Sequence, residues 1–145
     1  MKTALVMADT HGHKARIAMA LCRFADDVDM ILHLGDYSRD AEVIRRMTKL
    51  PVYAVRGNCD LASTEEAERL LTVEGVRVLM THGHRQNVKS SLLSLGLYAQ
   101  EQEANVALFG HTHVPSEEFF GSVLLYNPGS LGEPLYEDVV AVLAE

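Results

Sequence analysis

Short apolar runs that end in polar residues recur along this chain and alternate with longer segments of helical spacing. The first three runs, at 3–8, 30–34 and 52–55, are rich in aliphatic and β-branched residues, as buried strands are. Between them, 13–24 and 39–50 repeat apolar residues every three or four positions, which predicts helices. A strand–helix–strand–helix–strand order with crossovers of this length predicts a parallel sheet.

Each of these two helices has one face that we expect to be buried. The expected buried residues are Ile17, Ala20, Leu21 and Phe24 in the first helix, and Ala41, Ile44 and Met47 in the second.

The second half of the chain predicts less regular elements. Helices are expected at 64–71, with Ser63 or Thr64 as the N-cap, and at 88–101. Strands are expected at 76–80, 106–109, 118–120, 123–126 and 139–143, with a hairpin turn at Gly121 and Ser122. About eight strands are enough for two sheets packed together between helices, so the predicted fold class is α/β.

Length, composition and charge narrow the class of protein. The 145 residues suit one domain over 1–145, and the 48% of apolar residues can form a core without disulfides, with Cys22 expected to be buried. The net charge of −7 argues against duplex nucleic acid or an anionic membrane as the main partner. No apolar stretch approaches the roughly 20 residues of a membrane span, and the short N-terminal run does not resemble a signal peptide. We therefore expect a cytoplasmic protein. The sequence does not decide whether it forms an oligomer.

Polar residues with metal-binding chemistry follow five of the apolar runs. They are Asp9-Thr10-His11, Gly35-Asp36, Gly57-Asn58-Cys59-Asp60, Thr81-His82-Gly83-His84 and Gly110-His111-Thr112-His113. Loops at the carboxyl ends of strands converge in open α/β sheets, so these groups are expected to meet at one place.

The spacing within these motifs has a physical reason. Asp9 and His11 would project to the same side of an extended segment and grip one ion together. The glycines before Asp36, Asn58 and His111 permit unusual backbone angles and close approach. Asp36 has no paired ligand beside it, which suits a carboxylate that bridges two cations.

The donor atoms favour a transition metal over a structural zinc site. Carboxylate, imidazole and one amide oxygen suit Mn, Fe, Co, Ni or Zn, and the sequence does not choose among them. A structural zinc site would more often supply cysteine thiolates and close the coordination sphere.

Taken together, these motifs resemble the calcineurin-like metallophosphoesterase superfamily, and the likeness extends through Asn127-Pro128-Gly129-Ser130. The short chain and the Gly-Asn-Cys-Asp form look most like the small prokaryotic phosphodiesterase branch, which also contains relatives of the retromer scaffold subunit. The resemblance implies a four-layer α/β/β/α fold, in which two mixed β-sheets are sandwiched by helices. It also implies two divalent cations, with Mn preferred. One would be held by Asp9, His11, Asp36 and His113, and the other by Asp36, Asn58, His82 and His111, so that Asp36 is the bridge.

The function implied by the resemblance is a phosphodiesterase that acts on a small phosphate ester with a metal-bridging hydroxide as the nucleophile. Many family members have a leaving-group histidine where this chain has Cys59, and the segment 132–134 is Gly-Glu-Pro where a basic segment is expected. The absence of this leaving-group acid should slow the hydrolysis of alkyl phosphomonoesters most. A phosphomonoesterase for activated monoesters and a non-catalytic interaction scaffold of the same fold are the alternatives.

Three residues near the motifs are candidates for catalytic roles. His84 is a better candidate than Cys59 for an acid or oxyanion partner, because the ordinary thiol pKa is about 8.5. Orienting a ligand is an equal alternative for His84. Asp60 is the third candidate, although we expect it to brace the Asn58 loop rather than bind metal.

Several other polar residues have simpler interpretations. His33 is expected to be a hydrogen-bonded core histidine, and His13 is expected to face solvent. Arg56 and Arg85 are either phosphate contacts or ordinary exposed arginines. Asn127 and Ser130 are expected to form a structural loop close to the site.

Overall fold

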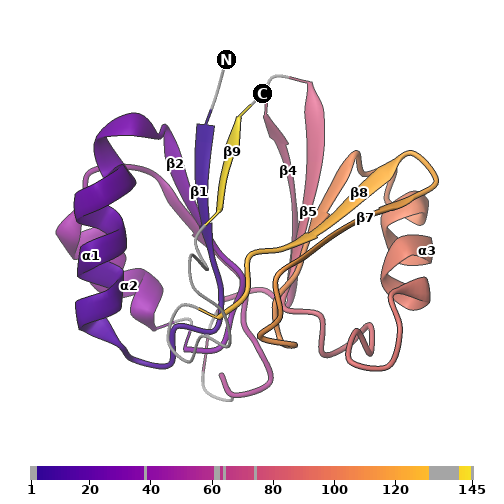
Figure 1. Cartoon of the computed structure of the whole chain (residues 1–145), viewed down its shortest axis with the longest axis horizontal. Coiled ribbons are helices and arrows are strands. Elements are labelled where there is room, and N and C mark those ends of the chain that lie inside the picture. The colour runs from indigo at the N-terminus through magenta and orange to yellow at the C-terminus, as the bar shows by residue number, and fades with distance from the viewer. Residues whose placement is uncertain are drawn as a thin grey trace.

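The fold is a four-layer arrangement in which two β-sheets lie face to face between helices (Figure 1). The computed structural model describes residues 3–37, 39–60, 63, 65–73, 75–130 and 141–144. One outer layer contains α1 (Lys14–Phe24) and α2 (Asp40–Met47), and the other contains α3 (Leu93–Glu101). A short 3-10 helix, η1 (Ala25–Asp27), continues from α1. The predicted α/β class with two mixed sheets is confirmed.

The first sheet has the strand order β3-β2-β1-β9. Its strands are β1 (Thr3–Met7), β2 (Met30–His33), β3 (Val52–Ala54) and β9 (Ala141–Ala144). The first three pair in parallel, with Leu5 opposite Ile31 and Ile31 opposite Val52, and β9 runs antiparallel to β1. The predicted strand–helix–strand–helix–strand unit is therefore confirmed.

The second sheet has the order β4-β5-β6-β8-β7. Its strands are β4 (Glu68–Val73), β5 (Val76–Thr81), β6 (Val106–Leu108), β7 (Ser116–Phe120) and β8 (Val123–Asn127). The inner strands β5, β6 and β8 pair in parallel, while the two edge pairs are antiparallel hairpins. The hairpin predicted around Gly121 and Ser122 is confirmed by the pairing of Phe120 with Val123.

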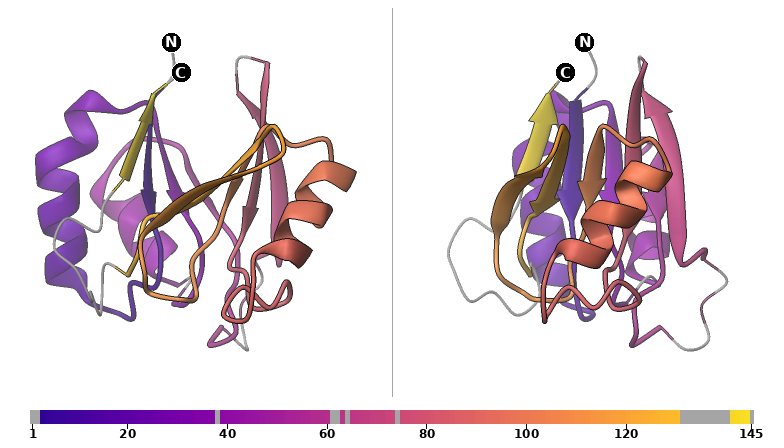
Figure 2. Two further views of the ribbon diagram at one scale, coloured as in Figure 1. Left: turned by 45° about the vertical axis from the view of Figure 1, so that its right-hand side comes forward. Right: turned by 90° about the vertical axis from the view of Figure 1, so that its right-hand side faces the viewer.

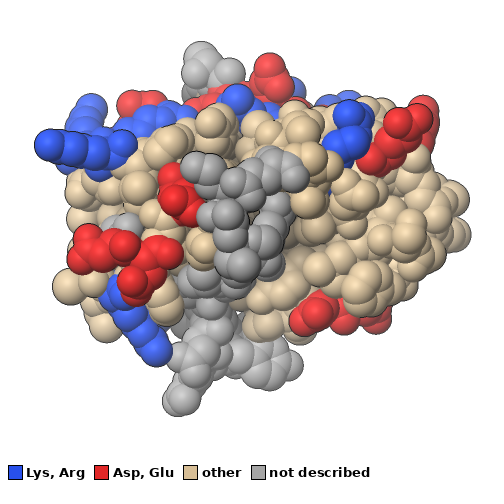
Figure 3. All heavy atoms as spheres, turned by 90° about the horizontal axis from the view of Figure 1, so that it is seen from above, with Lys and Arg blue, Asp and Glu red and all other residues tan. Residues whose placement is uncertain are grey.

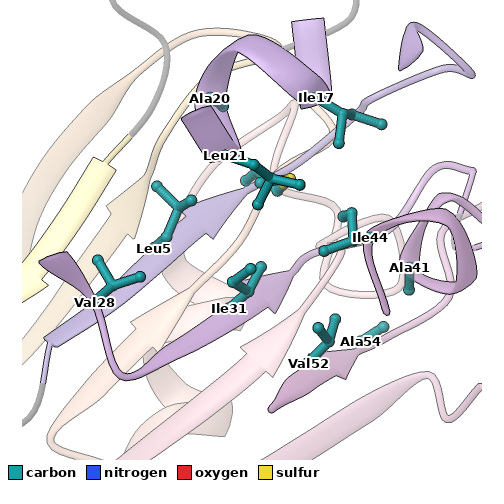
Figure 4. Packing of buried hydrophobic residues seen from close by; sticks show 11 residues of the cluster. Leu5, Ile17, Ala20, Leu21, Val28, Ile31, Ala41, Ile44, Val52 and Ala54 are labelled. Carbon is teal, nitrogen blue, oxygen red and sulfur yellow. The ribbon is translucent and has the colours of Figure 1, made fainter. Parts of the chain in front are cut away.

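Strands β1, β2 and β3 of the first sheet are almost wholly apolar, because both of their faces are covered. Alternate residues of a strand point to opposite faces, so Leu5 and Met7 pack beneath α1 and α2, whereas Ala4 and Val6 pack toward the second sheet. Figure 4 shows the first of these clusters, with Ile17 of α1 over the sheet. A third cluster lies between the second sheet and α3.

One predicted helix, at 64–71, is wrong. Within its described residues, β4 begins at Glu68 and pairs antiparallel with β5, so that Leu71 lies opposite Val78. The hydroxyl oxygen of Ser63 accepts a hydrogen bond from the backbone N–H of Glu65 (3.0 Å), as an N-cap would, but no helix follows. Pairing with a neighbouring strand outweighs a weak local helix preference.

Three further predictions are corrected by the structure. The helix predicted at 88–101 begins only at Leu93, after a run of turns. Met47 is 47% exposed. Ala41, Ile44 and Met47 are three residues apart, and each step of three residues is about 60° short of a full helical turn, so Met47 lies away from the face of Ala41. Cys22 is exposed rather than buried, because it lies about 100° around α1 from the buried Leu21.

The outer surface carries both positively and negatively charged side chains. On the face seen in Figure 3, Lys and Arg side chains lie at the edge next to Asp and Glu. None of the helices in the described part of the chain combines the length and the apolarity that a membrane crossing requires.

Candidate metal centre

The motif loops meet at one end of the two sheets, the lower end in Figures 1 and 2. The backbone N–H of Asp9 donates to the carbonyl of Gly35 (2.9 Å), which joins the loops after β1 and β2. The second sheet joins them through His82 Nδ1, which donates to the carbonyl of Leu34 (2.9 Å), and through the N–H of His111, which donates to Asp9 Oδ2 (3.0 Å). The expected convergence of the motifs is therefore present in the fold.

Two overlapping groups of potential ligand atoms lie at this point. Asp9, His11 and His113 form the first group, and Asp9, Asp36 and His82 form the second. Within each group the ligand atoms lie within 4.8 Å of one another. Asp9 is the residue that the two groups share, whereas the resemblance assigns the shared role to Asp36.

Distances within the first group suit a common cation. His113 Nε2 lies 3.4 Å from Asp9 Oδ1 and 3.4 Å from His11 Nε2. Two ligand atoms that share a tetrahedral ion at about 2.1 Å lie about 3.4 Å apart. The same spacing is long for a hydrogen bond between these groups.

The second group is similarly spaced and more deeply buried. His82 Nε2 lies 3.5 Å from Asp36 Oδ2 and 3.7 Å from Asp9 Oδ1. Because Nδ1 of His82 donates to a carbonyl, its Nε2 is the nitrogen left to bind a cation, and it faces the two carboxylates. A neutral imidazole with its other nitrogen anchored in this way is the usual form of a metal-binding histidine.

Buried atoms without hydrogen bonds provide an independent test of this fit. Among the described residues, Asp9 Oδ1, His82 Nε2 and His84 Nδ1 are buried side-chain atoms that lack a hydrogen-bond partner. Leaving such atoms unpaired is costly, and a carboxylate oxygen and an imidazole nitrogen are both good ligands for a divalent cation. The residues present therefore fit a metal centre.

The charges of the buried ligand groups at the centre are not balanced, and a bound cation would balance them. Burial raises the pKa of Asp9, although the charges of His82 and His113 oppose this effect. Burial also acts to raise the pKa of Asp36, but the close approach and the charge of His82 outweigh it, and the net pKa is lowered. The pKa of His82 is raised, because Asp36 and Asp9 outweigh the effect of burial.

The remaining two predicted ligands lie next to these groups. The ring of His111 is 5.0 Å from that of His82, centroid to centroid, and its pKa is lowered to about 4 by burial and the charges of His82 and Lys89. Asn58 is exposed, and its amide nitrogen lies 3.8 Å from the sulfur of Cys59. The backbone N–H of Cys59 in turn donates to Asp36 Oδ1 (3.0 Å), which ties this loop to the second group.

Five of the predicted ligands have left-handed backbone angles. The φ values are 52° for Asp9, 49° for His11, 48° for Asp36, 70° for His111 and 62° for His113. The extended segment predicted for Asp9 and His11 is therefore wrong, and a tight turn brings the two side chains together. Such angles are strained in residues other than glycine, and strain of this kind clusters at functional sites.

Two glycines allow the close approach expected of them. A Cβ atom at Gly57 would overlap Asp36 Oδ1, and one at Gly110 would lie 2.9 Å from both Ala8 Cβ and Asp9 Oδ2. Any side chain at either position would displace a carboxylate of the centre.

The three candidates for catalytic roles lie around this centre. Cys59 is exposed, and the partial desolvation of its thiol, together with the nearby Asp36 carboxylate, raises its pKa to about 11. Asp60 Oδ2 accepts a hydrogen bond from the N–H of Gly57 (2.7 Å), so Asp60 braces the Asn58 loop as predicted. The ring of His84 lies 5.5 Å from that of His82 and 6.2 Å from that of His111, and burial lowers its pKa.

The residues with simpler interpretations mostly lie where the sequence predicts. His33 is fully buried, His13 is exposed, and Arg85 is exposed and forms an ion pair with Glu68 (3.0 Å). Arg56 is exposed. The segment 132–134 lies outside the described residues.

The loop after β8 supports the centre from behind. The hydroxyl of Ser130 donates to the carbonyl of Asp9 (2.8 Å), and Asn127 Nδ2 donates to Thr112 Oγ1 (2.9 Å) and to the carbonyl of Gly110 (3.2 Å). The prediction of a structural loop near the site is therefore confirmed.

Some residues beside the centre were not predicted from the sequence. The ring of Tyr37 lies 5.5 Å from that of His11, and Asp40 is a buried acid that contacts the loop after β1. Tyr37 follows the Gly-Asp motif directly, which could have indicated it. Asp40 looks like an ordinary acidic residue in the first turn of a helix, and no sequence pattern marks it.

Comparisons with known proteins agree with this geometry. Residues 1–145 match the family model described as the calcineurin-like phosphoesterase superfamily domain. YsnB of Bacillus subtilis, named as a probable metallophosphoesterase, is 37% identical over 131 residues, which are 90% of this chain and 75% of YsnB. A phosphodiesterase of Methanocaldococcus jannaschii is 30% identical over 141 residues, covering 86% of this chain and 81% of that protein.

Solved structures share the fold. The crystal structure of a predicted phosphoesterase from Streptococcus pneumoniae has a TM-score of 0.81 at 27% identity and covers 99% of this chain and 83% of that one. A Vps29 variant from Entamoeba histolytica also has a TM-score of 0.81, at 21% identity, covering 99% of this chain and 86% of that one. The second likeness shows the fold alone.

Proposed function

We propose that this chain, which belongs to the calcineurin-like phosphoesterase superfamily and is a metal-dependent phosphoester hydrolase, cleaves small phosphodiesters with two divalent cations. The observation that carries the proposal is the pair of overlapping ligand groups, whose buried atoms Asp9 Oδ1 and His82 Nε2 have no hydrogen-bond partner within the described residues. The similarity to the Methanocaldococcus jannaschii phosphodiesterase supports the substrate class.

Seven side chains would hold the two cations. Asp9, His11, Asp36 and His113 would bind the first, and Asp36, Asn58, His82 and His111 the second. The two ligand groups support this division, because His11 and His113 fall in one and Asp36 and His82 in the other. Manganese is our first choice of metal, since mixed carboxylate and imidazole ligands suit it.

When bound, the two cations would lower the pKa of a shared water and stabilise negative charge on the phosphoryl oxygens. The protein's own part is to keep the ligands in place. His82 is oriented by the Leu34 carbonyl, Asp36 by the N–H of Cys59, and Asp9 by the N–H of His111.

The preference for diesters follows from the leaving-group side of the centre. A thiol with a pKa of about 11, as in Cys59, is a weak proton donor at neutral pH. His84 has a buried Nδ1 without a hydrogen-bond partner in the described structure, and we assign it to the leaving oxygen or to a phosphoryl oxygen. With a weak acid, substrates whose leaving groups are stable anions should react best.

Removal and return of metal is the test of this function. Chelation should abolish hydrolysis of bis(p-nitrophenyl) phosphate, and Mn²⁺ should restore it, with a higher kcat/KM than for p-nitrophenyl phosphate. Turnover that survives complete metal removal would contradict the proposal. Faster cleavage of the monoester would keep the metal centre and replace the substrate class with activated phosphomonoesters.

A non-catalytic interaction scaffold is the second candidate, favoured by the fold shared with Vps29. It predicts a protein that takes up metal, or fails to, without hydrolysing either ester. Turnover of the two esters, measured on protein supplied with Mn²⁺, therefore separates the scaffold from the enzyme.

A further inference from the structure

A chain of hydrogen bonds that the metal centre does not include lies directly behind it. Thr10 Oγ1 is 2.6 Å from Asp40 Oδ2 and 2.9 Å from His33 Nε2, and the N–H of Gly12 also donates to Asp40 Oδ2 (2.8 Å). The N–H of Gly35 donates to His33 Nδ1 (3.1 Å). Thr10 and His33 are completely buried, and Asp40 is 2% exposed.

The direction of each hydrogen bond in this chain is fixed by chemistry. Nδ1 of His33 accepts from a backbone N–H, so the proton of its neutral ring is on Nε2 and is donated to Thr10 Oγ1. The hydroxyl of Thr10 then has its own proton free to donate to the Asp40 carboxylate. Burial favours this neutral form, since it lowers the pKa of His33 to about 4.

This chain connects the two loops that carry the carboxylates. Thr10 lies between the ligands Asp9 and His11, whereas His33 and Gly35 precede Asp36. Asp40 begins α2, and through Thr10 and Gly12 it holds the loop after β1 against the start of this helix. Asp9 and Asp36 both have left-handed φ angles, of 52° and 48°, which local preference alone would not maintain.

We propose that Thr10, His33 and Asp40 are positioning residues that lock the Asp9 loop to the Asp36 loop, so that both cations depend on one buried relay. The proposal rests on the two-cation function proposed above. Neither His33 nor Asp40 touches substrate in this scheme, and neither needs to change its protonation state. Their effect is to keep two strained carboxylate loops at the separation that the cations require.

Removing the Thr10 hydroxyl tests the relay. Thr10→Val keeps the size and the β-branch but leaves His33 Nε2–H and Asp40 Oδ2 without this partner, while Thr10→Ser keeps the hydroxyl. We expect T10V to lower Mn²⁺ affinity in both binding steps by about 10–100-fold, the usual range for residues that orient metal ligands. T10S should stay near the wild-type affinity. Calorimetric titration of the chelator-treated proteins measures both steps.

Thr81→Val is the matched control. Thr81 is 2% exposed and precedes the ligand His82, but among the residues that the structure describes its hydroxyl is hydrogen-bonded only to Gln86 (2.9 Å) and to the N–H of Gly83 (3.2 Å), which belong to its own loop. T81V should therefore weaken at most the binding step that uses His82. Equal losses from T81V and T10V in both steps, or a T10V protein with wild-type affinities, would overturn the relay.

Two further measurements keep the outcome clear. Thermal unfolding of each metal-free variant shows that the fold is intact at the titration temperature, and Thr10→Ala takes the place of T10V if the valine variant does not fold. His33→Gln combined with T10V should cost less than the sum of the two single losses, because both break the same relay. A wild-type protein that binds no Mn²⁺ would instead refute the metal centre itself.

Discussion

The loops of the first sheet and those of the second sheet contribute differently to the centre. The first sheet supplies both carboxylates, and its loops are joined by their own contacts, through Asp9 with Gly35 and through Thr10 with Asp40. The second sheet supplies His82, His111 and His113. Its loops are joined by the bond of the Gly110 N–H to the His82 carbonyl (2.9 Å), and they also reach across to the first sheet through the bonds of His82 to Leu34 and of His111 to Asp9.

This difference suggests a division of labour between the two halves of the chain. The first half forms a carboxylate platform that holds its shape through a parallel sheet and a buried relay. The imidazoles of the second half are placed by docking onto that platform. Changes in the platform should therefore disturb both cations, and changes in the imidazole loops should disturb fewer.

The largest effect should come from removing one carboxylate of the platform. Asp36→Asn should cost both cations and reduce turnover by about a thousandfold or more, beyond the roughly 10–100-fold typical of residues that only orient ligands. His111→Asn should cost one cation. Metal content and kcat measured together on the two variants provide the check, with Asp26→Asn, at an exposed acid in η1, as a control that retains both cations.

The same experiment decides which carboxylate is shared. Asp9 belongs to both ligand groups in the structure, so Asp9→Asn should be compared with Asp36→Asn. Loss of both cations in D9N and of only one in D36N would assign the bridge to Asp9. If H111N also lost both cations, the proposed independence of the platform would be wrong.

A smaller effect should appear in the stability of the platform at low pH. His33 has a pKa of about 4 in the folded protein and an ordinary value of 6.5, so between these pH values the unfolded chain binds more protons. Protonation of His33 alone should therefore lower the free energy of unfolding of the metal-free protein by about 3 kcal/mol as pH drops from 6.5 to 4.

Denaturant unfolding at several pH values, with and without His33→Gln, measures this contribution. The variant should show a shallower decline, and part of the slope should persist because the pKa of His111 is also about 4. An unchanged pH dependence in H33Q would show that the buried histidine does not set the acid sensitivity of the platform.

The smallest predicted effect comes from one methyl group at the edge of the platform. Gly57→Ala should lower Mn²⁺ affinity by about 10–100-fold, because its Cβ would overlap Asp36 Oδ1 and push the carboxylate away. Gly75→Ala is the control, since a Cβ there meets nothing within 4 Å and its φ of +85° affects stability alone. Equal metal affinities in the two variants would show that the close approach at Gly57 is dispensable.

Much of the fold could be predicted from the sequence, and the failures have identifiable causes. The first three strands were predictable because both of their faces are buried, which makes the runs around Leu5 and Ile31 continuously apolar. The segment around Leu71 was misassigned, because an edge strand with one covered face carries a weak local signal and is decided by its pairing with β5.

The candidate site divides in the same way. Asp9, His11, Asp36, His82 and His113 could be chosen from the sequence because each follows an apolar run, and the structure brings their side chains together. The roles of Thr10 and Asp40 could not be predicted, since the two residues are 30 positions apart and only their hydrogen bond relates them. The left-handed turn at His11 could not be predicted either, because the presence of a histidine does not indicate a positive φ.

The sequence by itself determined which side chains this protein could offer to a metal and the strand ends at which they would stand. The side chains and the strand ends can both be identified from local sequence, in the apolar runs and in the residues that follow them. Only the tertiary structure decided that the second sheet docks its histidines onto the first and that a threonine, a histidine and an aspartate are buried together behind them. Those contacts join distant segments, and their energies depend on burial and geometry that no local pattern contains.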